Sequence, residues 1–217
     1  MLNRMNKTGL DIMSSLFLLT SECNCRMLCY KYKDMGDEYM ADEVKRVKRE
    51  LKYQGTVIKV YRDYMEFENG NTELWDYIHH DGAAAVVPVM DDGRILMVKQ
   101  YRNALERYTL EIPAGKLDDP EEPGIECATR ELEEETGYKS DQLEWLITLR
   151  TTVALCNERI EIFVAKNLIP SVQNLDEDEY IDVKAYSVDE LKEMIYSGKI
   201  EDSKTVSAIL AYDAKYN

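Results

Sequence analysis

One stretch, residues 115–138 with the sequence GKLDDPEEPGIECATRELEEETGY, constrains the fold of this chain more than any other. Its second half is typical of an amphipathic helix, because residues three and four positions apart lie on one helix face. The apolar stripe consists of Ile125, Ala128 and Leu132. Gly137 is placed to end the helix as a left-handed cap. The stretch therefore predicts a helix whose apolar side packs against a core.

The same helix carries a crowded acidic face formed by Glu131, Glu134 and Glu135. Carboxylates that crowd together repel each other, and a hard cation that prefers oxygen ligands removes this cost when it lies among them. Mg²⁺ and Mn²⁺ are such cations. A solvated acidic surface is the ordinary alternative for a run of glutamates, so the neighbouring residues have to decide between the two interpretations.

These residues resemble the signature of the Nudix hydrolases, G-x5-E-x7-R-E-U-x-E-E-x-G-U, in which U is an apolar residue. The half that begins at Arg130 fits the signature, with Tyr138 at its final position. In the other half, six residues rather than five separate Gly115 from Glu122, and we interpret residues 118–120 as a one-residue loop insertion before the helix. The glycines and the arginine at these spacings favour the metal site over a solvated acidic face.

Composition excludes several classes of function. The chain has 217 residues, enough for one domain with a sizeable core, and its net charge is −15. Nonspecific binding to nucleic acid or to an anionic membrane is therefore not expected, and a phosphate substrate would need a metal ion and local Arg or Lys residues. No apolar segment is long enough to span a membrane. The odd number of cysteines, five, favours a reducing cytoplasm.

The chain is expected to divide into an extension and a domain. Residues 1–39 look unlike the rest, and we expect a weakly ordered N-terminal extension there. Our hypothesis is that this segment comes from an over-long gene start, because Met40 could itself be a start. Residues 40–217 then form a Nudix hydrolase domain, with an N-terminal β-unit over 40–81 and the Nudix core over 82–217.

Apolar periodicity predicts a β-rich chain that ends in helices. Alternation begins at Gly55, Asn69-Gly70 marks a hairpin, and the continuous apolar run over 82–90 is typical of a strand buried on both faces. The expected strands cover residues 57–67, 72–79, 82–90, 94–101, 109–113, 143–152, 159–166 and 180–186. A capping box at Ser187 and a cap at Asp202 predict two C-terminal helices.

These elements predict an α/β (α+β) fold, with the acidic helix on one side of a mixed sheet and the C-terminal helices on the other. The Nudix resemblance implies the same arrangement, an α/β/α sandwich with a mixed sheet. The region before Gly82 resembles the additional N-terminal antiparallel β-unit of the ADP-sugar branch of the family. That unit helps to form a homodimer in the branch, so the resemblance implies a homodimer for this chain.

Further stretches resemble the ADP-ribose pyrophosphatase branch, and with the signature the resemblance covers about residues 50–215. They are residues 82–86, 98–102, 110–115 and 176–179. The resemblance implies metal-dependent hydrolysis of the pyrophosphate bond of ADP-ribose or of a related nucleoside diphosphate sugar. The products from ADP-ribose would be AMP and ribose 5-phosphate. The implied cofactor is Mg²⁺, with Mn²⁺ as an alternative.

The resemblance also implies which residues handle the metal and the attacking water. The implied metal ligands are the Ala114 carbonyl and the carboxylates of Glu131, Glu134, Glu135 and Glu179. Glu134 is implied either as a third ligand from the helix or as a partner of the other ligands. Arg130 would orient these carboxylates by ion pairing. Glu177, on a loop that substrate closure could order, is implied as the general base, and a solvated acidic loop is the alternative.

Three further residues are implied to bind the substrate. Arg102 follows a strand end, and its planar guanidinium suits phosphate binding, with a purely structural ion pair as the alternative. Glu111 resembles the family's glutamate that contacts the substrate or a neighbouring arginine. Glu158 lies in a stretch that resembles the end of a substrate loop. By contrast, His79 and His80 are expected to be structural.

The chain departs from the branch at two places. Thr152-Val153-Ala154 stands where the branch often has a Ser-Pro-Gly turn, and Trp75 stands where it has an arginine. Neither change removes a metal ligand or the base, so both bear on the identity of the substrate. The alternatives are hydrolysis of a nucleoside triphosphate or dinucleotide, and a Nudix-fold ligand sensor without catalysis. The complete set of helix carboxylates speaks against the sensor, as does a sequence without a helix-turn-helix pattern or basic patch.

Overall fold

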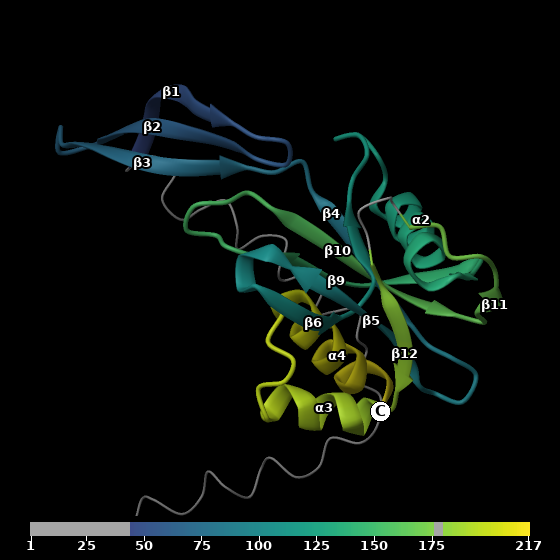
Figure 1. The fold of residues 1–217 in the computed structure, drawn as a ribbon. Coiled ribbons are helices and arrows are strands. Elements are labelled where there is room, and N and C mark those ends of the chain that lie inside the picture. The colour runs from purple at the N-terminus through teal and green to yellow at the C-terminus, as the bar shows by residue number, and fades with distance from the viewer. Residues whose placement is uncertain (1–43, 176–179) are drawn as a thin grey trace, which may run out of the picture.

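The computed structural model describes residues 44–175 and 180–217 as a set of β-sheets covered by three α-helices (Figure 1). These helices are α2 (Gly124–Thr136), α3 (Val188–Tyr196) and α4 (Ser203–Tyr216). Helix α2 lies on one side of the central strands and the α3–α4 pair lies on the other. This arrangement is the predicted α/β/α sandwich.

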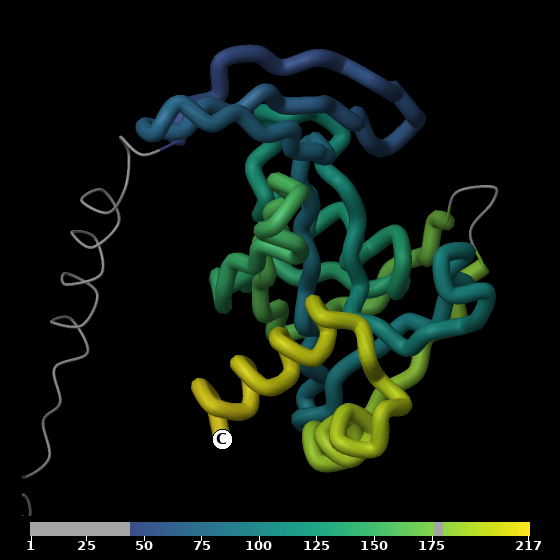
Figure 2. The backbone as a smooth tube through the Cα atoms, turned by 90° about the vertical axis from the view of Figure 1, so that its left-hand side faces the viewer, coloured from purple at the N-terminus to yellow at the C-terminus, as the bar shows by residue number. Residues whose placement is uncertain are grey.

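A separate antiparallel sheet lies at the end of the molecule away from α3 and α4 (Figures 1 and 2). It consists of β1 (Val44–Gln54), β2 (Lys59–Phe67) and β3 (Thr72–His79), paired in that order. The predicted hairpin joins β2 to β3, and its Gly70 has a φ of +80°, which glycine adopts readily. The sheet confirms the predicted N-terminal antiparallel β-unit.

Strand β1 was not among the predicted strands, because most of its residues are charged. Its neighbour β2 supplies a partner for some of these charges. Arg49 lies opposite Asp63 and donates hydrogen bonds of 2.6 Å to it from both Nε and Nη2. The Arg49 guanidinium also lies 3.7 Å from the centroid of the Tyr77 ring on β3. Cross-strand ion pairing and a cation–π contact therefore take the place of the apolar alternation that marks other strands.

The central sheet of the sandwich is mixed, as predicted. It runs in the order β7 (Ala114–Lys116), β4 (Ala83–Pro88), β10 (Arg159–Lys166) and β9 (Gln142–Arg150). β4 and β10 are parallel, whereas β7 and β9 are antiparallel to their neighbours. Parallel strands at the centre are covered on both faces, which explains why the β4 sequence is a continuous apolar run.

Two smaller sheets complete the strands of the described chain. The larger of them runs in the order β12 (Asp182–Tyr186), β5 (Ile95–Arg102) and β6 (Arg107–Glu111). A 3-10 turn, Asn103–Leu105, connects β5 to β6. The other sheet pairs β8 (Tyr138–Lys139) with β11 (Ile169–Pro170). Because β6 ends at Glu111 and β7 begins at Ala114, the single strand predicted over 109–113 is in fact the end of one strand and a link to the next.

Alternate residues of the central strands pack into different layers. Ala84 of β4 and Phe163 of β10 lie in a buried cluster with Cys127 of α2. Ala85 of β4 and Ile162 of β10 lie in the larger core with residues of α4. The pleat of a strand sends successive side chains to opposite faces, so these two strands hold both helical layers in place.

Capping residues set the helix ends as the sequence predicts. Gly137 follows α2 with a φ of +71°, the left-handed conformation expected of a C-terminal cap. Ser187 and Glu190 form the predicted capping box at the start of α3. The Asp202 side chain accepts a hydrogen bond from a backbone N–H in the first turn of α4.

Within the described ranges, no helix is long and apolar enough to cross a membrane. Two predictions fall on residues outside those ranges. They are the N-terminal extension over 1–39 and the acidic loop at 176–179 that holds Glu177 and Glu179.

Candidate active site

Helix α2 buries part of its acidic face as well as its apolar stripe. Ala128 and Leu132 are fully buried, as expected, but Ile125 is 44% exposed, which corrects its assignment to the stripe. The buried face is rotated toward the glutamates: Glu131 is only 9% exposed and Glu135 only 3%. Burying carboxylates is costly without partners, so these two residues are the first sign of a site with a specific purpose.

The two buried glutamates lie against the segment that contains β7. The Ala114 N–H donates a hydrogen bond of 2.9 Å to Oε2 of Glu135. Gly115 faces Glu131 so closely that a Cβ at position 115 would overlap the Glu131 carboxylate. A side chain at position 115 would therefore displace the Glu131 carboxylate, and the signature glycine and glutamate are neighbours in space.

Arg130 lies among four carboxylates. Its Nη1 donates hydrogen bonds of 2.7 Å to Glu131 and 3.1 Å to Glu134. On the other side its guanidinium lies 3.3 Å from Asp118 and 3.6 Å from Glu122, both from the loop before α2. One cation thus holds a group of four anions together, and the group keeps a net negative charge.

Cys127 completes the contact between α2 and β7. Its Sγ lies 3.6 Å from the Gly115 carbonyl and 3.5 Å from the Lys116 carbonyl, within reach of weak S–H hydrogen bonds. Burial, with the Glu131 charge nearby, raises the pKa of the thiol to about 12. The thiol therefore stays protonated, and Cys127 is a packing residue, as expected.

A polar cavity of about 370 Å³ opens beside the Ala114–Lys116 strand. The predicted substrate residues Arg102 and Glu158 both line it. One Glu158 oxygen accepts a hydrogen bond of 2.5 Å from the Thr151 hydroxyl, and the other lies 3.7 Å from Nε2 of His80. The Gly82 N–H donates to Nδ1 of His80, so this histidine is held in one orientation at the cavity wall.

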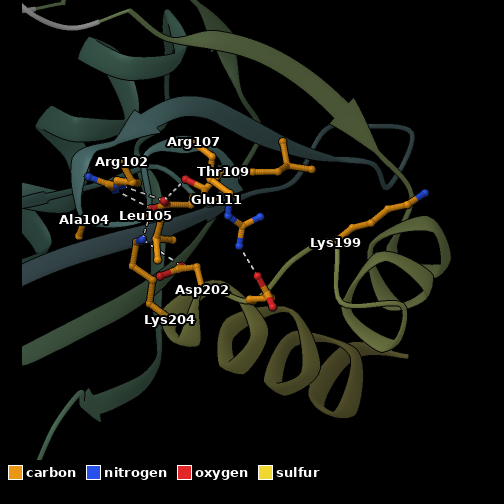
Figure 3. A pocket seen from close by; sticks show the side chains of 11 residues that line it. Arg102, Ala104, Leu105, Arg107, Thr109, Glu111, Lys199, Asp202 and Lys204 are labelled. Carbon is orange, nitrogen blue, oxygen red and sulfur yellow. Dashed lines mark hydrogen bonds and ion pairs between the residues drawn. The ribbon is translucent and has the colours of Figure 1, made fainter.

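Glu111, by contrast, does not line this cavity; it lies beside Arg102 and is only 2% exposed (Figure 3). It accepts hydrogen bonds of 2.8 and 2.6 Å from Nε and Nη2 of Arg102, one of 2.6 Å from Thr109, and one from Lys204. Burial alone would raise the pKa of Glu111, but hydrogen bonds from Arg102 and Lys204 outweigh it and lower the pKa to about 2. The sequence left two roles open for Glu111, contact with the substrate and contact with a neighbouring arginine, and the structure contains the contact with an arginine, Arg102.

A second cavity, of about 500 Å³, is lined in part by the same charged residues (Figure 3). It shares Arg102, Asp202 and Lys204 with the first cavity. The remaining lining comes from the β5–β6 connection, from β6 itself, which includes Glu111, and from the segment between α3 and α4. The Arg102–Glu111–Lys204 group is therefore a wall between two cavities.

The predicted metal ligands provide a suitable set of donors but are not arranged as a complete metal site. Within residues 44–175 and 180–217, no group of three or more His, Cys, Asp or Glu side chains is positioned to hold a metal ion. The donors themselves are all oxygens, namely the carboxylates of Glu131, Glu134 and Glu135 and the Ala114 carbonyl. Oxygen donors suit Mg²⁺ or Mn²⁺. The residue types therefore fit a hard divalent cation, with Glu179 of the predicted set outside the described ranges.

The Ala114–Lys116 strand connects the two parts of the site. Glu131 and Glu135 contact it from the α2 side, and the cavity with Arg102 and Glu158 opens on it. Sequence reasoning missed the contributions of Lys116, Thr151 and Lys204 to the cavity wall and assigned His80 a structural role only. Lys204 carried one usable signal, because it lies two positions after the Asp202 cap, at the start of a helix with an apolar face, and a charged residue that is buried there has to find a partner.

The fold and the site together define a class of protein: an α/β/α sandwich in which an acidic helix lies beside a polar cavity lined by Arg102, Lys116 and Lys204 together with Glu158 and Asp202. The family model described as the NUDIX domain matches residues 79–208. The chain therefore belongs to the Nudix family, and it is an enzyme of the Nudix hydrolase type.

Relatives with assigned names support the same placement. Over 169 residues the chain is 43% identical to the methanol dehydrogenase activator of Bacillus methanolicus and 38% identical to the ADP-ribose pyrophosphatase of Bacillus subtilis. Each match covers 77% of this chain and 91% of the relative. A crystal structure of an ADP compounds hydrolase has the same fold, with a TM-score of 0.72 at 24% identity over 79% of this chain and 93% of that one. The resemblance to the ADP-ribose pyrophosphatase branch is thereby confirmed.

Proposed function

We propose that this enzyme hydrolyses the pyrophosphate bond of ADP-ribose or of a related nucleoside diphosphate sugar, with a divalent metal ion as cofactor. The observation that carries the proposal is the position of the Ala114–Lys116 strand between two unlike groups. Buried carboxylates lie on one side of it and a cavity with cationic residues lies on the other. A pyrophosphate needs both, because its bridging region carries negative charge that must be neutralised before water can attack.

The cationic side chains of the cavity would bind the substrate. Arg102, Lys116 and Lys204 line it, in a chain whose net charge is −15. Local positive charge of this kind lets an anion enter a protein that would otherwise repel it. Arg102 would bind the diphosphate through its planar guanidinium, and Glu158 would contact the sugar or base.

The acidic side of the site would hold the metal ion. Glu131, Glu134, Glu135, Glu179 and the Ala114 carbonyl are the proposed ligands, and Arg130 would keep the helix carboxylates in place. When bound, Mg²⁺ or Mn²⁺ would supply neutralisation of the phosphate charge and activation of water. Glu177 would take a proton from the attacking water. A new oxygen–phosphorus bond forms, the bond to the bridging oxygen breaks, and ADP-ribose yields AMP and ribose 5-phosphate.

The test is turnover of a substrate panel by the purified full-length chain. ADP-ribose, ADP-glucose, NADH, diadenosine polyphosphates and nucleoside triphosphates would each be incubated with and without Mg²⁺, and the products would be separated by chromatography. We expect metal-dependent cleavage of ADP-ribose to AMP and ribose 5-phosphate. Preferential cleavage of a triphosphate or dinucleotide would replace the proposed substrate with that alternative. Folded protein that cleaves nothing in the panel would reject the proposal in favour of the ligand sensor.

The relative named methanol dehydrogenase activator favours a second candidate function, stimulation of an alcohol dehydrogenase. The match covers 91% of that relative, so the similarity is not confined to one segment. The two functions can be separated by assaying a purified methanol dehydrogenase with and without this protein. Stimulation that persists after Glu131→Gln would show an effect independent of hydrolysis, and stimulation that disappears would show that hydrolysis is its cause.

A homodimer through the β1–β3 sheet is part of the same proposal. The sheet stands apart from the sandwich and exposes large apolar side chains, namely Val47, Leu51, Tyr53, Leu74 and Trp75. Apolar patches of this kind are typical of surfaces that another chain covers. Light scattering should give about twice the chain mass of 25.2 kDa. Trp75→Glu should reduce the mass to that of one chain, whereas Tyr196→Glu, at an exposed aromatic residue of α3, should not.

We also place the enzyme in the cytoplasm. Cys127 and Cys156, the cysteines of the described ranges, are free thiols. Free thiols are the ordinary state of cysteines in a reducing compartment. Separation of cytoplasmic and secreted fractions followed by immunodetection would test this placement, and recovery from the secreted fraction would contradict it.

A further inference from the structure

The wall between the two cavities contains a lysine to which the site described above gives no role beyond its charge. Lys204, two residues into α4, is only 8% exposed (Figure 3). Its Nζ donates to the Glu111 carboxylate and also forms a 3.0 Å ion pair with Asp202. A buried lysine loses hydration and side-chain freedom, so its two ion pairs are what keeps it there.

The Arg102 guanidinium is held in a defined plane by the same carboxylate. Its Nε and Nη2 donate to the two oxygens of Glu111, at 2.8 and 2.6 Å. This bidentate pairing uses two of the three guanidinium nitrogens and leaves the third, Nη1, outside the contact with Glu111. Arg102 lines both cavities, so Nη1 is the part of the side chain that remains for a phosphate oxygen.

Lys204 shares Glu111 with Arg102, and the fold fixes it from the opposite side. Asp202 caps α4, and the Thr205 hydroxyl accepts a hydrogen bond of 3.0 Å from the Ile112 N–H, next to Glu111. The start of α4 is therefore attached directly to the end of β6. Lys204 also pairs with Asp202, so the group holds two cations and two carboxylates. Because Lys204 neutralises part of the Glu111 charge, the positive charge of Arg102 remains partly available to a ligand.

We propose that Lys204 is a positioning residue for diphosphate binding, which holds Glu111 so that Arg102 presents Nη1 to the substrate. This inference rests on the proposed function and adds a residue to it. Without Lys204, Arg102 would be the cation that remains paired with the buried Glu111 carboxylate. Glu111 would then neutralise more of the Arg102 charge, and binding of a diphosphate would weaken. The chemical step, which the opposite side of the site performs, would change little.

The experiment compares Lys204→Met with Lys199→Met in the full-length chain. Lys199 lines the second cavity and is exposed, so its substitution removes the same charge from the same region without touching Glu111. We expect Lys204→Met to raise the KM for ADP-ribose about tenfold, with kcat changed less than about threefold. Lys199→Met should change either constant less than about twofold.

A double-mutant cycle tests whether Lys204 acts through Arg102. In an Arg102→Met background, Lys204→Met should have almost no further effect on KM, because the residue that it positions is already absent. A full tenfold effect in that background would overturn the proposal, as would an unchanged KM in the single variant. Circular dichroism checks folding, and Lys204→Gln, which keeps a neutral donor for Glu111, replaces the Met variant if that variant does not fold.

Calorimetric titration with ADP-ribose in the absence of divalent ions separates failure of this inference from failure of the proposed function. Wild-type protein that binds ADP-ribose in this titration but does not cleave it in the turnover assay with Mg²⁺ would reject the proposed function, and the affinity of the Lys204 variants would still test the positioning role. Wild-type protein that cleaves ADP-ribose, with the same affinity and KM in the Lys204 variants, would reject the positioning role alone. Wild-type protein that neither binds nor cleaves it would reject both.

Discussion

The two charged groups of the site are built in opposite ways. Around α2, the single cation of Arg130 is paired with four carboxylates, whereas at the cavity wall Arg102 and Lys204 share Glu111, and Lys204 also pairs with Asp202. The first group has negative charge in excess and is suited to a metal cation. The second group has as many cations as carboxylates and places Arg102 and Lys204 at the cavity. The comparison shows how an acidic chain can bind an acidic substrate: the excess of carboxylates lies on one side of a short strand, and the cations that face the cavity lie on the other.

The largest effect is expected when the acidic group loses a buried charge. Glu131→Gln keeps the shape of the side chain but makes it a poor metal ligand. Substitution of residues that only hydrogen-bond to metal ligands already lowers activity by about 10- to 100-fold. For a ligand itself we therefore expect a fall in kcat of at least about 100-fold. The assay is steady-state turnover of ADP-ribose with Mg²⁺, with folding checked by circular dichroism. Glu126→Gln, on the exposed first turn of α2, is the matched control and should retain activity.

Removing the shared carboxylate of the second group should mainly affect stability. Glu111→Gln leaves Arg102 and the buried Lys204 without their common anion. Breaking a buried ion pair by removing one partner costs about 3 kcal/mol or more. Urea denaturation at pH 7 would measure this loss. A free energy of unfolding within about 0.5 kcal/mol of the wild-type value would show that the group contributes no net stability.

The same carboxylate gives the stability a defined dependence on pH. Its pKa is about 2 in the folded chain against an ordinary value of 4.5. A carboxylate whose pKa is lowered by folding stabilises the folded state fully above pH 4.5, and this stabilisation is lost as the pH falls toward 2. The shift corresponds to about 3 kcal/mol at pH 7. The difference in unfolding free energy between wild type and Glu111→Gln should therefore fall by more than half between pH 7 and pH 3, and a constant difference would contradict the assigned ion pairs.

A smaller effect on activity is expected from a substitution at Gly115, where the backbone contacts the Glu131 carboxylate. Gly115→Ala places a methyl group where the Glu131 carboxylate lies, so that side chain must move. Overpacking costs about 1–3 kcal/mol in well-packed sites, and the cost is at the low end here because a side-chain terminus can shift. We expect a small decrease in melting temperature and a roughly tenfold loss of kcat, since misplacement by about 1 Å is costly in catalysis. Full activity would show that the close approach has no role in catalysis.

The smallest effect separates helix capping from substrate binding. Asp202→Ala and Ser187→Ala each remove an N-terminal cap, which costs about 1 kcal/mol of stability. Only Asp202 pairs with Lys204, so only its substitution should raise the KM for ADP-ribose, by about two- to threefold. Thermal denaturation and steady-state kinetics of both variants provide the measurement. Equal KM values in the two variants would show that the Asp202–Lys204 pair does not affect substrate binding.

Local sequence signals account for the layers of the fold. The continuous apolar run of β4 predicts a strand covered on both faces, and Ser187, Asp202 and Gly137 predict the helix ends found in the structure. Strand β1 escaped prediction because its stability comes from pairing with β2, which its own sequence does not display. Ile125 was wrongly placed in the buried stripe because the helix turns its glutamates inward, against the ordinary preference of charged residues for water.

In the candidate site, too, some contacts can be predicted from a local motif and others arise only from the fold. Spacing within one helix brings together Arg130, Glu131 and Glu134, so a motif predicts their proximity. The contact between Glu111 and Lys204 joins residues 93 positions apart, and no local periodicity indicates it. Only the attachment of α4 to the end of β6 brings that lysine to the wall. Roles for Glu177 and Glu179, outside the described ranges, stay predictions from the family resemblance.

The loop before α2 has a consequence for how such enzymes can be found and altered. Although the segment between Gly115 and Glu122 is one residue longer than the signature allows, Glu122 still reaches Arg130, and it also accepts a 2.7 Å hydrogen bond from the Asp118 N–H that closes the loop. The distance that matters is thus measured through space and not along the chain. A search with a rigid pattern would discard this sequence, and a protein engineer can treat residues 118–120 as a place where the chain accepts extra length.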